Sequence, residues 1–272
     1  MNKKLLLLLG CLLVAVQFGF GQARKVRSEP LIWTEIEADY ILPNKSFFYF
    51  RNQYRHNTDP GFPGIKESGA LSKFYQAYVL LGYEHRFSDH WVSGLSGRYT
   101  FDADNDNKML QFYLQHTGKI GSVNFLKRLT YDYMKPEFGD SRGRTRLRAG
   151  LEKDFTVGKS LLRPHISYEL FLYNDFQKDN ETLIEERTVD RTRLRLAVSY
   201  KVSSFLWLTP YFTKQTDYFN VLATYTGEFD ADGNPIVKDE GGKLNRIDPI
   251  IGLDIRFILG DNAASPSPGT LK

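Results

Sequence analysis

The side chains with the clearest chemical potential belong to a pentad, RTRLR, that occurs twice in the sequence. The two copies occupy 144–148 and 191–195 and contribute Arg144, Arg146, Arg148, Arg191, Arg193 and Arg195. Three arginines within five residues are typical of surfaces that bind nucleic acid or other anions. Both copies continue as alternating polar and apolar residues. What the arginines can bind therefore depends on the side of a strand on which they lie.

A second candidate set lies between the pentads, in His165-x-Ser167-x-Glu169. A serine and a histidine with an acid or Asn form the nucleophilic site of outer-membrane phospholipases and lipid A deacylases. Residues two apart along a strand are roughly 7 Å apart, which is long for direct proton transfer from Ser167 to His165. The Asn or Gly that follows the serine in those hydrolases is also absent. We therefore expect no catalytic residues and no enzyme, with a lipid hydrolase as the alternative, and interpret His165 as a wall residue facing Glu152.

Two acidic loops imitate the opening of a calcium-binding loop, namely DADNDN at 102–107 and DADGNP at 230–235. A calcium loop of this type needs a glutamate at its twelfth position. Tyr113 and Gly241 stand at those positions. We interpret both loops as hydrated hairpin tips, and we expect no metal site and no cofactor.

Residues 1–21 predict a secretory signal peptide, because Lys3 and Lys4 precede an apolar stretch and small residues precede Gln22. A membrane anchor and a lipoprotein modified at Cys11 are the less favoured interpretations. Cleavage removes the two lysines, which lowers the net charge from +4 to +2, and it also removes the only cysteine. The remaining charge does not suit a nucleic-acid binder. A mature chain without cysteine cannot be stabilised by disulfides.

Beyond residue 30, apolar residues recur at every second position, as in β-strands. Leu110, Phe112 and Leu114, for example, alternate with Gln111, Tyr113 and Gln115. The same contrast recurs at 161–174 and 245–257, and more weakly at 46–56, 72–87, 91–101, 122–134 and 205–216. No apolar run of 18 residues follows the signal peptide, so no membrane-spanning helix is expected.

The connections between these segments alternate between short turns and longer polar loops. Short turns are expected at 88–90, 118–121, 158–159 and 203–204, and long loops near 57–71, 102–107, 135–143, 174–187 and 216–243. An antiparallel up-and-down transmembrane β-barrel has tight periplasmic turns and larger outer loops. Greek-key sandwiches do not place all short turns at one end and all long loops at the other. The sequence therefore predicts an all-β fold of this barrel type.

Strand counting leaves two alternatives, about ten strands or twelve. The segment 31–42 also has the pattern of a strand. It lies either in the periplasm or lumen, or in a twelve-stranded wall to which the 216–243 region adds one more strand. We expect a signal peptide at 1–21, an N-terminal segment with a possible extra strand at 22–45, the barrel at 46–259, and a disordered tail at 260–272.

Charge matching predicts the register of one hairpin. If 144–174 folds on the turn Gly158-Lys159, facing residues have numbers that sum to 317. One face then pairs Asp154 with Arg163, Glu152 with His165 and Arg148 with Glu169, while the other pairs Leu147 with Leu170 and Leu151 with Ile166. A slip by one residue would destroy both sets of pairs.

The cost of burying charge in lipid predicts which face is inside. An arginine on the lipid face near mid-membrane costs about 2–4 kcal/mol, so the pentad arginines are expected to face the lumen. The predicted lumen charge network comprises Arg144, Arg146, Arg148, Glu152, Asp154, Arg163, His165, Glu169, Arg191, Arg193 and Arg195. The same parity adds four more arginines to this network, namely Arg51, Arg55, Arg98 and Arg128. Their expected counterions are Glu84, Asp132, Asp248 and Asp254. Such an interior should cross-link itself and leave at most a tight passage that favours anions.

The outer face of the barrel is predicted to carry aromatic residues at the membrane interfaces. Interfacial aromatic girdles are predicted from Trp91, Tyr99, Tyr131, Tyr133, Tyr168 and Trp207. Lys127 breaks the pattern, because its parity places it outside with Phe125 and Leu129. Either it reaches an interface through its flexible chain, or the register there differs.

Several short motifs are shared with a known family. They are Trp33-Thr-Glu35, the YRH at 54–56, the two RTRLR strands and Arg163-Pro-His-Ile-Ser-Tyr-Glu169. In these motifs the chain resembles the uncharacterised outer-membrane barrel family known as domain of unknown function 2490. The resemblance implies a β-barrel in the outer membrane of a Gram-negative bacterium. It implies no established activity and no catalytic residues.

We therefore expect an exported outer-membrane protein that acts as a structural or surface-interaction barrel, or as a narrow porin-like channel with an arginine-rich lumen. Its expected partners are outer-membrane lipid, the barrel-insertion machinery and a small anionic solute, with no nucleic acid. The insertion machinery is expected because Ile255-Arg-Phe257 resembles the C-terminal signal of barrel proteins, although fifteen residues follow it.

Overall fold

The computed structural model describes residues 23–59, 61, 64–66, 73–158, 160–175, 187–230, 232–239 and 241–260. The predicted signal peptide, residues 261–272 of the predicted tail and residues 176–186 of one predicted loop lie outside this set. Within it, every regular element is a β-strand. The same residues contain no helix long and apolar enough to cross a membrane.

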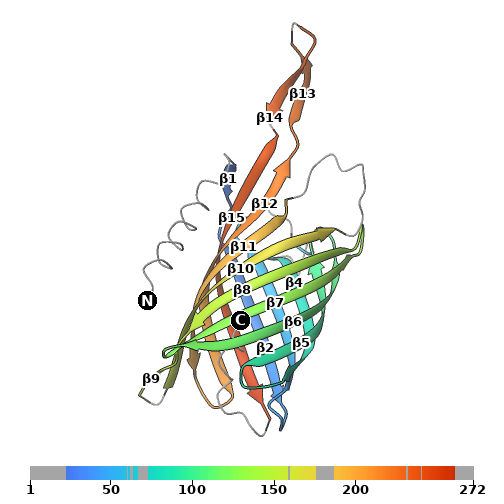
Figure 1. Ribbon diagram of the computed structural model, residues 1–272. Coiled ribbons are helices and arrows are strands. Elements are labelled where there is room, and N and C mark those ends of the chain that lie inside the picture. Colours follow the sequence, from blue (N-terminus) through green and yellow to red (C-terminus); the bar gives the residue numbers. More distant parts are fainter. Residues whose placement is uncertain are drawn as a thin grey trace, which may run out of the picture.

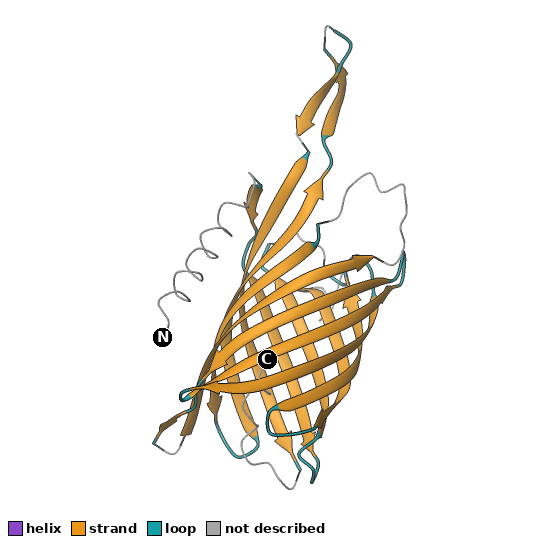
Figure 2. Ribbon diagram, in the orientation of Figure 1, coloured by secondary structure: helices purple, strands orange, loops and turns teal. Residues whose placement is uncertain are grey.

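Eleven strands of the described chain close into a barrel (Figures 1 and 2). They are β2 (Leu31–Ile41), β3 (Phe47–Asn57), β4 (Phe74–Arg86), β5 (Trp91–Asp102), β6 (Asn107–Ile120), β7 (Val123–Pro136), β8 (Arg142–Glu152), β10 (Ser160–Asp175), β11 (Val189–Lys201), β12 (Leu206–Val221) and β15 (Gly242–Leu259). Four shorter strands accompany them, namely β1 (Arg24–Arg27), β9 (Phe155–Val157), β13 (Thr224–Phe229) and β14 (Pro235–Asp239). The prediction of an all-β barrel is confirmed.

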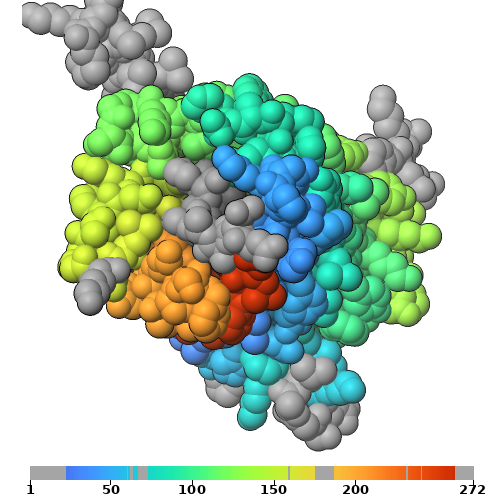
Figure 3. All heavy atoms as spheres, turned by 90° about the horizontal axis from the view of Figure 1, so that it is seen from below, coloured from blue at the N-terminus to red at the C-terminus, as the bar shows by residue number. Residues whose placement is uncertain are grey.

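The strand count lies between the two predicted values because 31–41 forms a wall strand. β2 pairs antiparallel with β3 on one side and parallel with β15 on the other, from Leu31 opposite Ile250 to Tyr40 opposite Leu259. With an odd number of alternating strands, the first and last run in the same direction, so the closing pair must be parallel. The barrel is therefore mixed, and its wall begins before residue 46. Figure 3 shows this seam from below, with the red C-terminal strand beside the blue N-terminal ones.

Parallel closure places the start of β2 and the end of β15 at opposite ends of the barrel. The chain enters β2 at the end that carries the long connections and leaves β15 at the end that carries the short turns. β1 extends the seam beyond β2, pairing in parallel with 244–247 of β15. β13 and β14 form a separate hairpin that projects away from the barrel at the long-connection end (Figure 1). The described residues of the 216–243 region therefore add no twelfth wall strand.

The predicted hairpin register is confirmed. In the β8–β10 and β9–β10 ladders, Arg148 faces Glu169, His165 faces Glu152 and Phe155 faces Leu162. All these pairs have the predicted sum. The strand is interrupted between β8 and β9, where Lys153 donates its backbone N–H to the carbonyl of Pro164. Proline has no N–H to complete the ladder, which explains the break.

The two faces of the wall separate as the alternation predicts. Leu110, Phe112 and Leu114 of β6 are exposed on the outside, whereas Tyr113 and Gln115 are buried inside. Lys127 also lies exposed on the outside, opposite His116 and Ala149, so the predicted register was right there.

Trp207 corrects the predicted outer girdle. It is fully buried inside the barrel, with the guanidinium of Arg163 5.4 Å from its ring centroid. It shares the inward parity of Thr209, and the ring packs against a cation. The prediction that it faces an interface was wrong.

Candidate functional site in the barrel lumen

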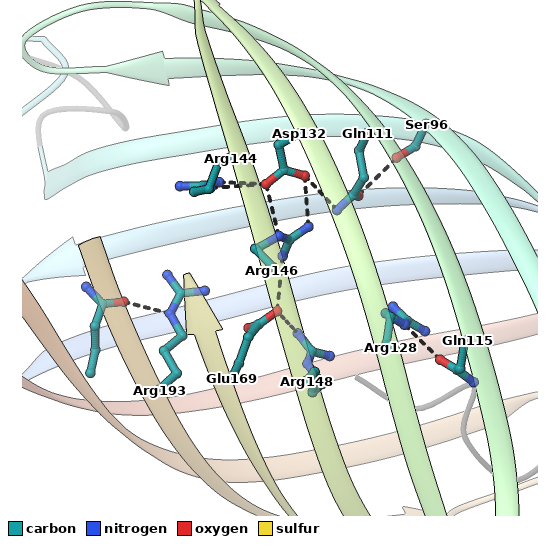
Figure 4. A network of polar contacts seen from close by, with 11 residues as sticks. Ser96, Gln111, Gln115, Arg128, Asp132, Arg144, Arg146, Arg148, Glu169 and Arg193 are labelled. Carbon is teal, nitrogen blue, oxygen red and sulfur yellow. Dashed lines mark hydrogen bonds and ion pairs between the residues drawn. The ribbon is translucent and has the colours of Figure 1, made fainter. Parts of the chain in front are cut away.

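The first pentad lies on β8 with its three arginines directed into the lumen, the interior of the barrel (Figure 4). Asp132 of β7 accepts hydrogen bonds from Arg144 Nη2 at 3.0 Å and Arg146 Nη2 at 3.1 Å. Glu169 of β10 accepts from Arg148 Nη2 at 2.9 Å and lies 3.4 Å from Arg146 Nη1. Both carboxylates are buried. Every arginine of this pentad therefore has a carboxylate partner.

The polar network continues across neighbouring strands. Gln111 of β6 donates from its amide to Asp132 at 3.2 Å, and its carbonyl accepts from the Ser96 hydroxyl of β5 at 3.1 Å. Buried polar groups that lose water need such partners, because an unsatisfied one costs about 1–3 kcal/mol. The chain of contacts links four adjacent strands, β5 to β8, through the lumen (Figure 4).

The second pentad lies on β11 and is partnered differently. Arg191 forms an ion pair with Asp217 of β12, and Arg195 Nη2 lies 2.5 Å from Asp254 of β15. Arg193, between them, donates from Nε to the side-chain carbonyl of Gln215 at 2.7 Å. A neutral amide therefore takes the place that a carboxylate takes beside Arg146.

The remaining residues of the predicted network lie on the same inner face of β8 to β10. Arg163 is buried and pairs with Asp154, with 3.0 Å between Arg163 Nη2 and Asp154 Oδ2. Glu152 is buried opposite His165. Ser167 is buried beside them, and neither ring nitrogen of His165 forms a hydrogen bond with it among the described residues. Glu169 is held by two arginines, so the three residues of the hydrolase alternative do not form a catalytic chain.

Three acids of β2 belong to the lumen and were missed from the sequence. Glu35, Glu37 and Asp39 are all buried on the inner face. Asp39 accepts from Arg256 Nε at 2.7 Å, which links the two strands of the seam, and Glu37 lies 3.5 Å from Arg51 Nε. Their spacing of two residues between apolar neighbours was the available signal. The favoured ten-strand interpretation left 31–42 out of the wall, so these three acids were not assigned to the inner face.

The four carboxylates expected to pair with the other lumen arginines contact different residues. Asp132 and Asp254 serve the pentads, and Asp248 lies 3.3 Å from Arg246 Nε. The remaining one, Glu84, accepts a hydrogen bond from the Tyr113 hydroxyl. Of the four arginines assigned by parity, only Arg51 therefore gains an ion pair in the described chain. The other three are Arg55, Arg98 and Arg128.

Tyrosine rings fill part of the lumen by lying over glycines. Tyr49 faces Gly82, Tyr113 faces Gly94 and Tyr211 faces Gly252 across adjacent strands. A Cβ atom at any of these glycines would overlap the tyrosine ring. Glycine is therefore required by the close approach of each ring to the neighbouring backbone.

A cavity of about 110 Å³ remains among these side chains. By this measure one water needs about 10–15 Å³, so the cavity can hold several waters or one small ion. Its charged lining consists of Arg51, Arg55, Arg98, Arg128, Arg146, Arg148, Arg193, Arg195, Glu35 and Glu169. The electrostatic character of the cavity is therefore strongly positive.

The two acidic loops lie outside the lumen as connections. Residues 103–106 join β5 to β6, and Asp230 lies at the tip of the β13–β14 hairpin. Asp230 Oδ1 accepts the backbone N–H groups of Asn234 at 2.8 Å and Asp232 at 2.9 Å. The bond from Asn234, above all, holds the pKa of Asp230 below its usual value. Among the described residues, no three His, Cys, Asp or Glu side chains are grouped to hold a metal ion.

Comparison with known proteins places the chain in a family. No curated protein matches the sequence. The family model described as Protein of unknown function (DUF2490) matches residues 31–221. This match runs from the first residue of β2 to the last residue of β12 and so covers the wall up to β15. The chain with this arginine-lined lumen therefore belongs to the DUF2490 family.

Proposed function

We propose that this protein is an outer-membrane β-barrel that serves as a structural and surface-interaction barrel with a blocked lumen. The observation that carries the proposal is the opposite polarity of the two faces of the wall. Large apolar side chains such as Phe112, Leu147 and Tyr168 are exposed outside, whereas ion-paired arginines and acids fill the inside. That arrangement suits hydrocarbon around the barrel and is unfavourable in water.

The proposed orientation places the long connections outside the cell and the short turns in the periplasm. The β13–β14 hairpin then stands at the cell surface, where exposed Tyr225 and Phe229 are available for contact. The parallel seam adds a specific consequence: β1 lies at the outer end while Leu259 lies at the periplasmic end. Outer-membrane lipid and the barrel-insertion machinery are the partners that this placement requires.

A blocked lumen is supported by the contacts that cross it. Charged side chains from neighbouring strands bond one another, tyrosine rings cover glycines, and the cavity measures only about 110 Å³. A barrel of this size is close to the limit at which side chains fill the interior. Open, porin-like conduction is therefore not the function that we propose.

Two measurements test this proposal. An epitope tag placed just before β1 should be reached by antibody on intact cells, together with a tag in the β13–β14 hairpin, whereas a tag after Leu259 should need permeabilised cells. The protein should also fractionate with the outer membrane and resist urea extraction. Protein recovered in a soluble fraction, or the reverse pattern of tags, would contradict the placement.

Planar-bilayer recording tests the blocked lumen. We expect no conductance steps from the purified full chain. Steady anion-selective steps would identify a narrow channel instead.

A further inference from the structure

Four arginines around the lumen cavity have no carboxylate partner in the part of the chain that the structure describes. They are Arg55, Arg98, Arg128 and Arg193, from four different strands. Within the described part of the chain, no Asp or Glu oxygen lies within 4.0 Å of their guanidinium nitrogens. The other four cavity arginines, Arg51, Arg146, Arg148 and Arg195, each pair with a carboxylate. Half of the cationic lining therefore has no described carboxylate to neutralise its charge.

Neutral hydrogen-bond acceptors orient three of these four side chains, those of Arg55, Arg128 and Arg193. Arg128 and Arg193 each donate from Nε to a glutamine carbonyl, that of Gln115 or Gln215, at 2.7 Å. Arg55 donates from Nε to Gln53 at 2.6 Å. Amide acceptors orient a guanidinium but leave its positive charge unneutralised. In Arg128 and Arg193 the described contacts also leave both terminal nitrogens without an acceptor.

Aromatic rings support the same four cations. The guanidinium of Arg55 lies 4.0 Å from the Trp33 ring centroid, and that of Arg193 lies 5.3 Å from it. Arg98 lies 5.1 Å from the Tyr78 ring, and Arg128 lies 4.3 Å from the Tyr113 ring. A ring face attracts a cation without cancelling its charge. The cavity is therefore lined by oriented cations and not by neutralised ion pairs.

The charge balance of the cavity favours a multiply charged anion. Eight arginines line it, against two lining glutamates and the three acids behind them that pair with lining arginines, namely Glu37, Asp132 and Asp254. This leaves a surplus of three positive charges in a volume of about 110 Å³. That volume admits a tetrahedral oxyanion and excludes a nucleotide or sugar phosphate. Planar guanidinium groups also match the oxygens of such an anion.

We propose that the lumen cavity is a binding site for a small, multiply charged oxyanion of the phosphate class. Arg55, Arg98, Arg128 and Arg193 supply the charge-assisted hydrogen bonds, and Ser167 and Thr130 supply neutral donors at the wall. The inference concerns the inside of the barrel only. It does not depend on the membrane in which the barrel lies, so it can fail while the proposed location holds.

Equilibrium dialysis of the purified full chain in a neutral detergent against labelled inorganic phosphate tests the proposal. We expect one phosphate per chain, displaced by sulfate but not by chloride at matched ionic strength. The double variant Arg98→Gln/Arg193→Gln should bind at least about tenfold more weakly, since a charge-assisted hydrogen bond contributes about 1.5–3 kcal/mol. It leaves no carboxylate without a partner, so it should still fold, which heat modifiability on gels verifies.

Two further variants separate this site from general charge effects. Lys127→Gln removes one positive charge from the outer wall and should leave phosphate binding unchanged. Gln115→Glu places a carboxylate beside Arg128 and should weaken binding while the cavity keeps its shape. Equal displacement by chloride, unchanged binding in the double variant, or a loss caused by Lys127→Gln would each overturn the proposal.

Discussion

The two RTRLR pentads are identical in sequence, yet their arginines have different surroundings. Both are strand segments with a leucine outside, and Leu147 and Leu194 are exposed on the outer wall. Inside, the central arginine of the first pentad, Arg146, contacts both Asp132 and Glu169. The corresponding Arg193 donates to the amide of Gln215 and lies near aromatic rings, and it forms no ion pair within the described residues. The same side chain is a structural cross-link in one pentad and an unneutralised cation in the other.

The position of one carboxylate explains the difference. Glu169 of β10 lies between the pentads, directly opposite Arg148 on β8 and Arg193 on β11. Its Oε1 atom accepts from Arg148 and approaches Arg146, so it is committed to the first pentad. Arginines paired with carboxylates stabilise the wall, whereas an arginine held only by neutral groups keeps a positive charge that can bind a ligand. This comparison suggests four experiments.

The largest effect is expected from Asp132→Asn. It should lower the free energy of unfolding by about 3–5 kcal/mol, because Arg144 then loses the one carboxylate that it contacts among the described residues, and Arg146 loses one of its two, in a buried setting. Urea unfolding followed by tryptophan fluorescence measures the loss. Asp217→Asn is the matched control in the second pentad. Its effect should be smaller, because one of its partners, Arg246, has a side chain that is 47% exposed. Equal losses would mean that burial does not set the strength of these pairs.

Substitutions of the outward-facing leucines, Leu147 and Leu194, should change stability by similar amounts in the two pentads. Leu147→Arg and Leu194→Arg should each cost up to about 2–4 kcal/mol in lipid vesicles, because each places a charge against hydrocarbon. Leu147→Ala and Leu194→Ala control for lost side-chain volume. If the arginine variants are no less stable than the alanine variants, the outer wall does not face lipid.

A double-mutant cycle tests the role of Glu169. Arg148→Gln alone should cost about 1–2 kcal/mol, since Arg146 stays close to the carboxylate and Arg193 is available to approach it. In that background, Arg193→Gln should cost clearly more than it does in the parent. If the losses of stability caused by Arg148→Gln and Arg193→Gln are additive, Glu169 does not couple the two pentads.

The smallest effect is expected from Arg193→Gln in the parent chain. It removes one hydrogen bond to Gln215 and relieves repulsion among neighbouring arginines, so stability should stay within about 1 kcal/mol of the parent in phosphate-free buffer. Urea unfolding in the same detergent as for Asp132→Asn makes the comparison direct. A loss of several kcal/mol would make Arg193 a structural residue like Arg146.

Much of the wall was predictable because strand alternation is a local property. Residues two apart in a strand lie on the same face of the sheet. The inward direction of both pentads and the exposed position of Lys127 could therefore be predicted without tertiary information. The β8–β10 register was also predictable, because a short turn brings Arg148 and Glu169 together and only one register matches both faces.

The candidate site was less predictable, because partners come from strands that are distant in sequence. Arg256 and Asp39 are 217 residues apart, and their contact exists only when β15 closes on β2. The favoured ten-strand count left 31–42 out of the wall, and with it Glu35, Glu37 and Asp39. Including this segment also changes the strand count and with it the direction of the closing pair.

The sequence by itself determined which side chains face inward, because the pleat of a strand alternates at every residue whatever its neighbours are. Only the tertiary structure decided which arginines are neutralised. Neutralisation depends on which strand lies alongside and on how a shared carboxylate such as Glu169 turns. Glu169 lies opposite both Arg148 and Arg193, and because its carboxylate turns toward Arg148 and Arg146, Arg193 is left with an amide.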